Sequence, residues 1–219
     1  NGVTLRVPEG FHVTEFASGF SKARYMINGP GGEILLSDSA VKGSVYALTD
    51  RNKDGRIGDD EKKQLITGLD RPFGLALWKG YLYIAESTAI KRYKYDSARQ
   101  ELSAPEEIIP LKGETQGHWT RTLLFDKKGQ SLYVGIGSRS NITPGDPEYR
   151  AAVLRFQPDG TRREVVASGI RNPIGMDWNP ATGKLWAAIQ ERDGLGDDLV
   201  PDFYTSIQPG GFYGWPYAY

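Results

Sequence analysis

The stretch Thr120–Ser138, which reads TRTLLFDKKGQSLYVGIGS, has the form of a β-hairpin. An apolar run, LLF, leads into the polar turn DKKGQ, and an alternating run, LYVGIG, follows it. β-Branched and aromatic residues favour extended backbone, and the glycine supplies the positive φ that a tight turn between two strands requires. This stretch therefore predicts two antiparallel strands.

The same pattern occurs at three other places in the chain. It is found at Ala23–Ser39, Pro72–Thr88 and Pro173–Glu191, so that the repeats begin roughly 50 residues apart. Further strand-like runs follow each of the first three repeats, and the last of these runs read KQLITGL, EEIIPL and REVVASGI. Repeats of this length with about four short strands each are typical of a β-propeller.

The sequence therefore predicts an all-β fold, a single β-propeller domain over residues 1–219 with blades of four antiparallel strands. We expect the blades near residues 11–70, 72–112, 120–170 and 173–219, of which the last is incomplete. A blade buries its faces against its neighbours, and a propeller closes into a ring. Because the chain stops within the pattern, at GGFYGWPYAY, we expect either a fragment of a longer protein or one chain of a larger assembly.

The charge balance and composition exclude several classes of partner and chemistry. The chain has 27 basic and 27 acidic residues, which argues against general affinity for nucleic acid or for an anionic membrane. No apolar run approaches the ~18 residues that a membrane-spanning helix needs. Since the chain contains no cysteine, disulfides, thiolate catalysis and zinc–thiolate sites are excluded.

The segment Asp50–Glu61, DRNKDGRIGDDE, matches the spacing of a twelve-residue calcium loop. An EF-hand has amphipathic helices on both sides, but here GSVYALT precedes the loop and KKQLITGL follows it, and both are strand-like. We therefore expect a calcium-binding connection between two strands; the alternative is an acidic hairpin without metal. The predicted ligands are side-chain oxygens of Asp50, Asn52, Asp54 and Glu61 and the backbone carbonyl of Arg56.

Three polar features fall at equivalent ends of the predicted blades. His118 in GHWTR precedes the third repeat, Arg171 in RNP precedes the fourth, and the polar loop Gln190–Asp202 follows the second strand of the fourth. Separately, each has an ordinary structural explanation: a packed histidine, an arginine paired with a surface carboxylate, and a solvated acidic loop. Together they predict one end of the propeller with a base, an arginine and a cation-binding loop.

Four motifs in order make the sequence resemble the soluble quinoprotein sugar dehydrogenases, especially their sorbosone dehydrogenase-like branch. The motifs are GHWTRTLLFD, SGIRNPIGMDW, ERDGLGDDLVPD and GGFYGWPY, and the resemblance extends from about Val7 to the end of the chain. The ordered set is far more specific than any single motif. The family resemblance implies a six-bladed propeller, of which about four blades lie in this chain.

The resemblance also implies a cofactor and roles for individual residues. Pyrroloquinoline quinone (PQQ) would lie on one face of the propeller, held by a calcium ion and by basic residues. His118 would act as the general base, Arg171 would polarise a quinone carbonyl, and Asn172 would help to hold the cofactor. Backbone carbonyls of Glu191 and Arg192, within one residue, would bind the calcium ion.

The sequence departs from the family at two points. The further cofactor-binding lysine and arginines would lie after Tyr219, so the chain holds at most half of the pocket. Soluble glucose dehydrogenases carry an acid after the GIG of the third blade, whereas this chain has Ser138, which leaves the sugar undefined. Arg139 and Asn141 are candidate substrate contacts.

The leading prediction is a PQQ- and calcium-dependent oxidoreductase that transfers hydride from an aldose or a sorbosone-type sugar. One alternative is a calcium-dependent lactonase-like hydrolase, in which side chains such as Glu86, Asn141 and Asn172 would converge on one ion. Another is a recognition propeller without enzymatic activity. The predicted partners are the sugar, an external electron acceptor and the remaining blades, without nucleic acid or membrane insertion. Calcium use and family habit predict a periplasmic or secreted location.

Overall fold

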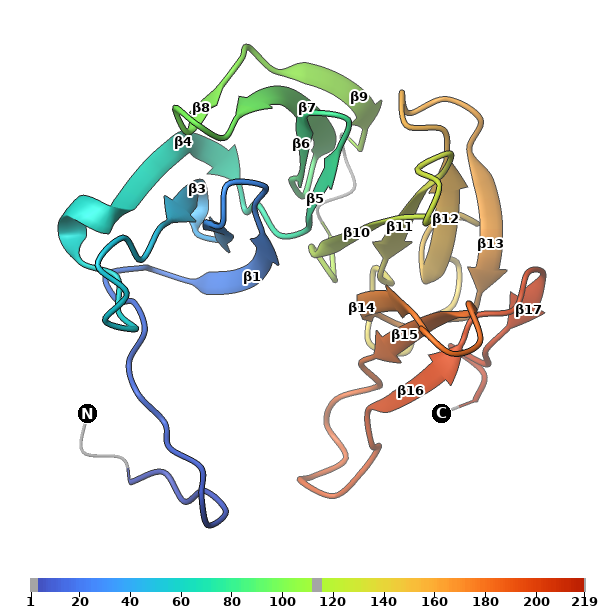
Figure 1. The fold of residues 1–219 in the computed structure, drawn as a ribbon. Coiled ribbons are helices and arrows are strands. Elements are labelled where there is room, and N and C mark those ends of the chain that lie inside the picture. Colours follow the sequence, from blue (N-terminus) through green and yellow to red (C-terminus); the bar gives the residue numbers. More distant parts are fainter. Residues whose placement is uncertain (1–3, 112–115, 219) are drawn as a thin grey trace.

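The computed structural model describes residues 4–111 and 116–218. Within these ranges the chain is built from β-strands that form four sheets, with a single short 3-10 turn, η1 (Asp59–Glu61). The predicted all-β propeller fold is therefore confirmed. Figure 1 shows the sheets fanned out in an arc, with both ends of the chain on its open side.

The strands of each sheet follow one another in the chain. The first sheet contains β1 (Ala23–Asn28), β2 (Ile34–Asp38), β3 (Val41–Leu48) and β4 (Lys62–Asp70). The second contains β5 (Leu75–Trp78), β6 (Tyr81–Ala85), β7 (Ala89–Asp96), β8 (Glu101–Leu102) and β9 (Glu106–Pro110), where β8 and β9 both pair with β7. The third contains β10 (Arg121–Phe125), β11 (Leu132–Ile136), β12 (Ala152–Phe156) and β13 (Glu164–Ser168). The fourth contains β14 (Pro173–Trp178), β15 (Leu185–Ile189) and β16 (Phe203–Ser206).

The hairpin of β10 and β11 shows why the repeated pattern folds in this way. Phe125 pairs with Leu132, and the turn between them is closed by Asp126, whose Oδ1 accepts hydrogen bonds from the amides of Lys128 and Gln130. Gly129 has a φ of +61°, a conformation that disfavours a residue with a side chain. The turn residues seen in the sequence therefore fix the register of the two strands.

Apolar side chains fill the spaces between neighbouring sheets. One cluster joins the first and second sheets around Leu35 and Leu82, and a second joins the second and third around Tyr83 and Val134. A third cluster, which includes Met176, joins the third and fourth sheets. The first strands β1, β5, β10 and β14 also contact one another in sequence, so they line the inner side of the arc (Figure 1).

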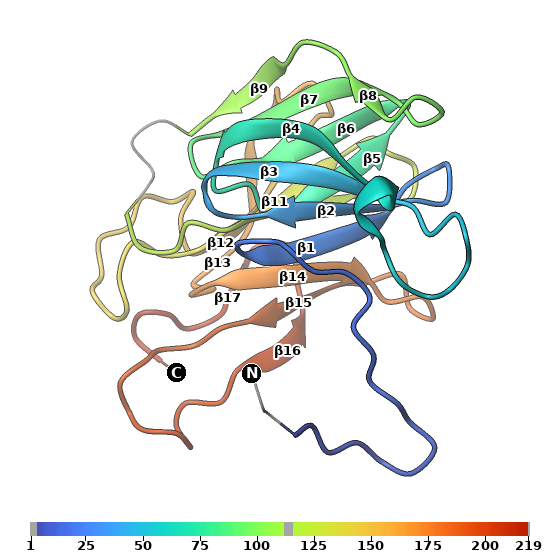
Figure 2. The same ribbon diagram turned by 90° about the vertical axis from the view of Figure 1, so that its left-hand side faces the viewer.

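Two segments do not extend the sheet that is nearest to them in the chain. Residues 4–22 contain no strand and lead away from the first sheet (Figure 2). The short strand β17 (Gly211–Phe212) does not extend the fourth sheet; it pairs in parallel with β13 of the third. The motif GGFYGWPY therefore ties the end of the described chain to the outer edge of the preceding blade.

The sheets at the two ends of the arc leave large apolar side chains exposed. Met26 of the first sheet is 60% exposed, and Trp186 and Tyr204 of the fourth are 40% and 79% exposed. Apolar patches of this kind mark surfaces that pack against another element. Within residues 4–111 and 116–218, no helix has the length and apolar character needed to cross a membrane.

Candidate functional site

Four connecting segments meet around a cavity at one end of the inner strands. They are the segment before β10, the segment after β11, the segment before β14, and the β15–β16 loop (Gln190–Asp202). The cavity has a volume of about 360 Å³. Its lining consists of Arg24, Gly117, His118, Trp119, Thr120, Arg139, Ser140, Asn141, Arg171, Asn172, Gln190 and Asp193. The structure thus brings the separately predicted His118, Arg171 and β15–β16 loop into one place.

His118 is held with one ring nitrogen turned into the protein. Its Nδ1 lies 3.0 Å from the carbonyl oxygen of Ser138 and 3.0 Å from the Ser138 hydroxyl. A carbonyl oxygen can only accept a hydrogen bond, so Nδ1 carries the proton of the neutral ring. Nε2 is therefore the basic nitrogen, as a general base requires.

The environment keeps the His118 ring neutral. Burial lowers the pKa of His118 to about 4; the nearby Arg171 guanidinium adds to the lowering, and the bond to Ser138 opposes it. A buried imidazolium is disfavoured because it would lose hydration beside another cation. The imidazole can therefore accept a proton throughout the neutral pH range.

Two buried arginines hold the backbone around His118. Nη1 of Arg121 donates to the carbonyl oxygens of His118 and Thr120, at 2.8 and 2.9 Å. Arg150 donates from Nη2 to the carbonyl oxygens of Gln116 and Ser138, at 2.8 and 2.9 Å. A signal for Arg121 was present in the sequence, as a charged residue at the start of an apolar strand, but its role was not predicted. Arg150 gave no such signal because it lies in an irregular segment.

Glycine is required at two positions beside His118. A Cβ atom on Gly137 would lie 2.4 Å from Oδ1 of Asn172 and 2.6 Å from Cβ of His118. Gly117 has a φ of +65°, and a Cβ there would lie 2.2 Å from the Arg139 carbonyl oxygen. The close approach of these loops therefore depends on the absence of side chains at both positions.

Arg171 is buried and makes contacts with every side of its guanidinium. Nε and Nη2 donate to the backbone oxygen and Oδ1 of Asn141, at 3.1 and 2.8 Å, and Nη2 also pairs with Asp193 at 2.8 Å. Nη1 donates to the carbonyl oxygens of Gln190, at 3.3 Å, and Glu191. The guanidinium therefore joins the loop after β11 to the β15–β16 loop.

The carbonyls of Gln190 and Glu191 both point towards one Arg171 nitrogen. This pair begins one residue earlier than the predicted pair of Glu191 and Arg192. The Glu191 side chain is also buried, and its Oε2 has no hydrogen-bond partner. Burial raises the pKa of this carboxyl. Two carbonyl oxygens that converge on one cationic nitrogen, and an unsatisfied carboxyl oxygen of the same short segment, are oxygen donors of the kind that calcium binds, so these residues fit the implied ion.

Asn172 and Asn141 have distinct positions. Asn172 is buried, and its Nδ2 donates to Oε1 of Gln190 at 3.0 Å, so its amide lies at the cavity wall. Asn141 accepts from Arg171 and from the Asp193 amide, and its Nδ2 donates to the Asp193 carbonyl at 2.9 Å. The side chain of Asn141, a predicted substrate contact, thus makes its hydrogen bonds to Arg171 and Asp193. The other predicted contact, Arg139, also lies on the cavity lining.

Trp215, in the motif GGFYGWPY, explains why that motif accompanies the site. It is buried, and its Nε1 donates to the carbonyl oxygen of Asn141 at 3.0 Å. The same oxygen accepts from Nε of Arg171. This hydrogen bond from Trp215 therefore helps to fix the backbone of Asn141. The sequence contained the motif but not this contact, which spans 74 residues.

The β3–β4 loop (Asp50–Glu61) joins two strands, as predicted, and its acidic side chains bind its own backbone. Asp50 accepts from the amides of Asp54 and Gly55, at 3.2 and 3.0 Å. Buried Glu61 accepts from the amides of Arg51 and Gly58, at 2.8 and 3.1 Å. In the part of the chain that is described, no group of three or more His, Asp or Glu side chains is arranged to hold a metal ion. The remaining predicted ligands Asn52 and Arg56 lie in the same exposed turn.

Glu86, a ligand in the lactonase alternative, points elsewhere. Its Oε1 pairs with Nζ of Lys91 at 2.6 Å, and its Oε2 accepts from the Asp70 amide at 2.8 Å. Its carboxylate is therefore already neutralised and hydrogen-bonded. That alternative requires side-chain carboxylates and amides from several blades to converge on one ion, and among the described residues no group of three or more His, Asp or Glu side chains is so arranged.

Comparison with known proteins identifies the family. A family model described as TrAA12-like matches residues 5–202, which is most of the chain. The chain belongs to the TrAA12-like family.

The individual relatives agree with the predicted resemblance. This TrAA12-like chain is 28% identical to an uncharacterized protein of Borreliella burgdorferi, over 99% of the chain and 57% of the relative. It is 23% identical to a pyrroloquinoline quinone-dependent sugar dehydrogenase of Hypocrea jecorina, over 96% of the chain and 56% of the relative. The resemblance to quinoprotein sugar dehydrogenases is confirmed at the level of the family; the sorbosone-like branch stays a prediction.

Solved structures show the same fold. The holo PQQ domain of a pyranose dehydrogenase from Coprinopsis cinerea aligns with a TM-score of 0.80 at 19% identity, over 96% of this chain and 58% of that one. A calcium structure of a family AA12 enzyme from Trichoderma reesei aligns with a TM-score of 0.77 at 21% identity, over 95% and 59%. The chain thus spans little more than half the length of the relatives named here.

Proposed function

We propose that this chain is the part of a PQQ- and calcium-dependent sugar dehydrogenase that carries the general base and the cation-binding loop. The observation that carries this proposal is His118, whose proton is fixed on Nδ1 by Ser138 while its low pKa keeps Nε2 free to accept a proton. This ring lines the same cavity as Arg171 and Gln190. A base and a positive charge on one cavity suit the removal of a proton from a sugar hydroxyl and of a hydride from the carbon that bears it.

His118 would take the proton from the hydroxyl of an aldose or a sorbosone-type sugar at Nε2. PQQ, when bound, supplies the acceptor for the two electrons of the hydride. The imidazolium formed after proton transfer is adjacent to Arg171 and is therefore destabilised, which favours rapid return of the proton to water or to the reduced acceptor. Asn172 and Arg171 would hold the cofactor from the side of the fourth sheet.

The calcium ion would bind to the carbonyl oxygens of Gln190 and Glu191, with Arg192 next in the loop. In the chain described here, Nη1 of Arg171 occupies the position between these oxygens. A calcium ion there would replace the guanidinium contact, because a divalent cation satisfies two carbonyls more strongly than one arginine nitrogen. Nη1 would then be free to donate into the cavity, where it could polarise a carbonyl group.

We assign a structural role to the β3–β4 loop. Its spacing matches a calcium loop, and a bound ion would replace the hydrogen bonds that Asp50, Asp54 and Glu61 now make to backbone amides. The loop lies at the outer part of the first sheet, between β3 and β4. An ion there would stabilise this hairpin and would take no part in the reaction.

The other predicted partners belong to the same proposal. The exposed apolar faces of the first and fourth sheets would pack against the remaining blades, in the same or another chain. Those blades would supply the other half of the cofactor pocket. An external acceptor would reoxidise the cofactor, and a periplasmic or secreted location would supply the calcium.

The test is a titration of the calcium-loaded, full-length parent protein with PQQ. We expect saturable binding in the cofactor's absorbance spectrum, with aldose-dependent reduction of a dye. Removal of calcium with a chelator should abolish dye reduction, and calcium should restore it. Absence of both binding and dye reduction in the parent would overturn the proposal, and hydrolysis of a lactone would then support the hydrolase alternative.

A further inference from the structure

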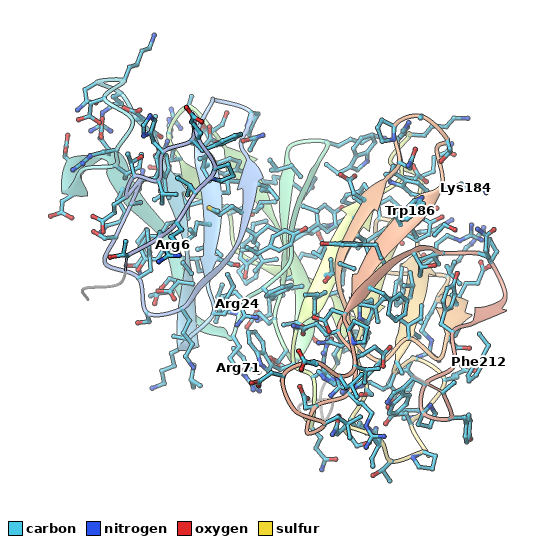
Figure 3. All side chains as sticks on the ribbon, turned by 90° about the horizontal axis from the view of Figure 1, so that it is seen from below. Arg6, Arg24, Arg71, Lys184, Trp186 and Phe212 are labelled. Carbon is cyan, nitrogen blue, oxygen red and sulfur yellow. The ribbon has the colours of Figure 1, made fainter. Side chains whose placement is uncertain are left out.

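Two arginines that the proposed reaction does not use lie against the tryptophan next to His118. The guanidinium carbons of Arg24, in β1, and of Arg71, after β4, each lie 5.7 Å from the centre of the Trp119 ring. Arg24 also lies 5.9 Å from the Phe73 ring, which meets Trp119 edge to face. Contacts with aromatic faces hold the two cations in place. Figure 3 shows Arg24 and Arg71 next to each other, as their shared contact with Trp119 requires.

The two arginines are poorly neutralised by the protein. Among the described residues, no carboxylate pairs with Arg24, which is exposed and lines the cavity. In the part of the chain that the structure describes, Arg71 has one ion pair, with Asp70 at 3.4 Å. Asp193 is the acidic side chain on the cavity lining, and it already pairs with Arg171. This side of the cavity therefore carries an excess of positive charge.

Such an arrangement favours an anionic ligand. Two guanidinium groups against one ring raise each other's electrostatic energy, and a carboxylate between them would relieve this repulsion. Guanidinium groups bind carboxylates through paired N–H donors, and Trp119 holds both groups in position to do so. Because Arg24, Trp119 and His118 line the same cavity, a sugar bound there would lie next to the base.

We propose that Arg24, Arg71 and Trp119 form a subsite for the carboxylate of an acidic sugar, of the uronate class. This inference rests on the proposed dehydrogenase function and specifies its substrate. The anomeric hydroxyl would lose its proton to His118, and the hydride would leave the anomeric carbon, with PQQ, when bound, supplying the acceptor. The carboxylate at the far end of the sugar would be unchanged and would only orient the ring.

The experiment compares glucuronate with glucose in the full-length, cofactor-loaded parent protein. In the wild-type protein we expect kcat/KM to be higher for glucuronate, and this preference to fall with added salt. Arg24→Gln should lower the ratio of the two kcat/KM values about tenfold, the loss of one charge-assisted hydrogen bond. Arg24→Lys should restore part of the ratio. The matched control is Arg163→Gln, which removes an arginine that lies over the Tyr149 ring, 5.2 Å from its centre, outside this cavity.

Each outcome separates this inference from the proposed function. Oxidation of glucose with no preference for glucuronate, or a ratio unaffected by Arg24→Gln, would overturn the subsite and leave the dehydrogenase standing. Weaker PQQ binding in Arg24→Gln with an unchanged ratio would mean that the arginines hold the cofactor, and would also overturn it. Binding of glucuronate but not glucose, measured by calorimetry in a parent without dehydrogenase activity, would support the subsite and overturn the proposed reaction.

Discussion

The β3–β4 loop and the β15–β16 loop make an instructive comparison, since both were predicted to bind calcium. The β3–β4 loop has the stronger local motif, yet its carboxylates bind amides of the same loop. The β15–β16 loop has no comparable spacing of acidic residues. Two of its carbonyl oxygens, those of Gln190 and Glu191, nevertheless accept from the guanidinium of Arg171, which belongs to another segment. A local motif therefore forms a self-contained turn, whereas the candidate reaction site depends on segments far apart in the sequence.

The largest expected effect comes from removing the base beside the β15–β16 loop. His118→Gln in the full-length parent should lower kcat about 100-fold or more, because the side chain can no longer accept a proton. Cofactor affinity should change little, and dye-reduction kinetics together with PQQ titration measure both quantities. The control is His12→Gln, which removes the only other histidine, an exposed one. Turnover equal to that of the wild type would exclude His118 as the base.

The pH profile gives the next largest effect. A base with a pKa of about 4 loses activity only as the pH falls towards 4. At pH 5 the kcat/KM should stay near its plateau, whereas an imidazole with an ordinary pKa of ~6.5 would be about 30-fold below it. The acid limb of kcat/KM between pH 4 and 7 measures this difference. A limb centred near pH 6.5 would mean that burial and Arg171 do not control the ring.

The same pKa also predicts how stability changes with pH. His118 binds a proton below pH ~6.5 in the unfolded chain but only below about 4 in the folded one. The unfolded state therefore gains protons first, and the free energy of unfolding should fall as the pH drops from 6.5 to 4. Urea unfolding of wild type and His118→Gln should show a smaller fall in the variant. Identical slopes would contradict the lowered pKa.

A smaller effect is expected from loss of the hydrogen bond between Trp215 and the Asn141 carbonyl. Trp215→Phe removes the hydrogen bond to the Asn141 carbonyl, so Arg171 should lose part of its alignment. We expect kcat to fall about fivefold, with a change in calcium dependence, since one lost hydrogen bond is equivalent to ~1 kcal/mol. Trp178→Phe is the matched control, because its Nε1 donates to the Phe125 carbonyl away from the cavity. If both variants lowered kcat equally, Trp215 would contribute to stability and not to the alignment of Arg171.

The smallest effect on turnover is expected from the β3–β4 loop. Calcium at 100 times its Kd should stabilise the parent protein by about 2.7 kcal/mol through this loop, and Asp50→Asn should remove most of that gain. Turnover at saturating calcium should not change. Asp59→Asn is the control, because Asp59 is fully exposed and is not a predicted ligand. Thermal unfolding with and without calcium measures this stabilisation. A loss of turnover in Asp50→Asn would mean that the β3–β4 loop, like the β15–β16 loop, takes part in the reaction.

The sequence by itself determined the repeating hairpins and the strands that follow them. Alternating apolar residues and turn glycines such as Gly129 act over a few residues, so their consequences can be read locally. They also placed His118 and Arg171 at equivalent junctions. The pairing of β17 with β13 could not be predicted in this way, because a two-residue strand has no pattern of its own.

Only the tertiary structure determined the protonation state and the contacts of the residues at those junctions. The neutral state of His118 comes from burial and from the nearby Arg171 charge, and the position of Arg171 comes from Asn141, which Trp215 holds from a distant segment. The two arginines against Trp119 come from opposite edges of the first sheet. Such effects depend on distances through space and on loss of hydration, and a linear pattern of residue types carries neither.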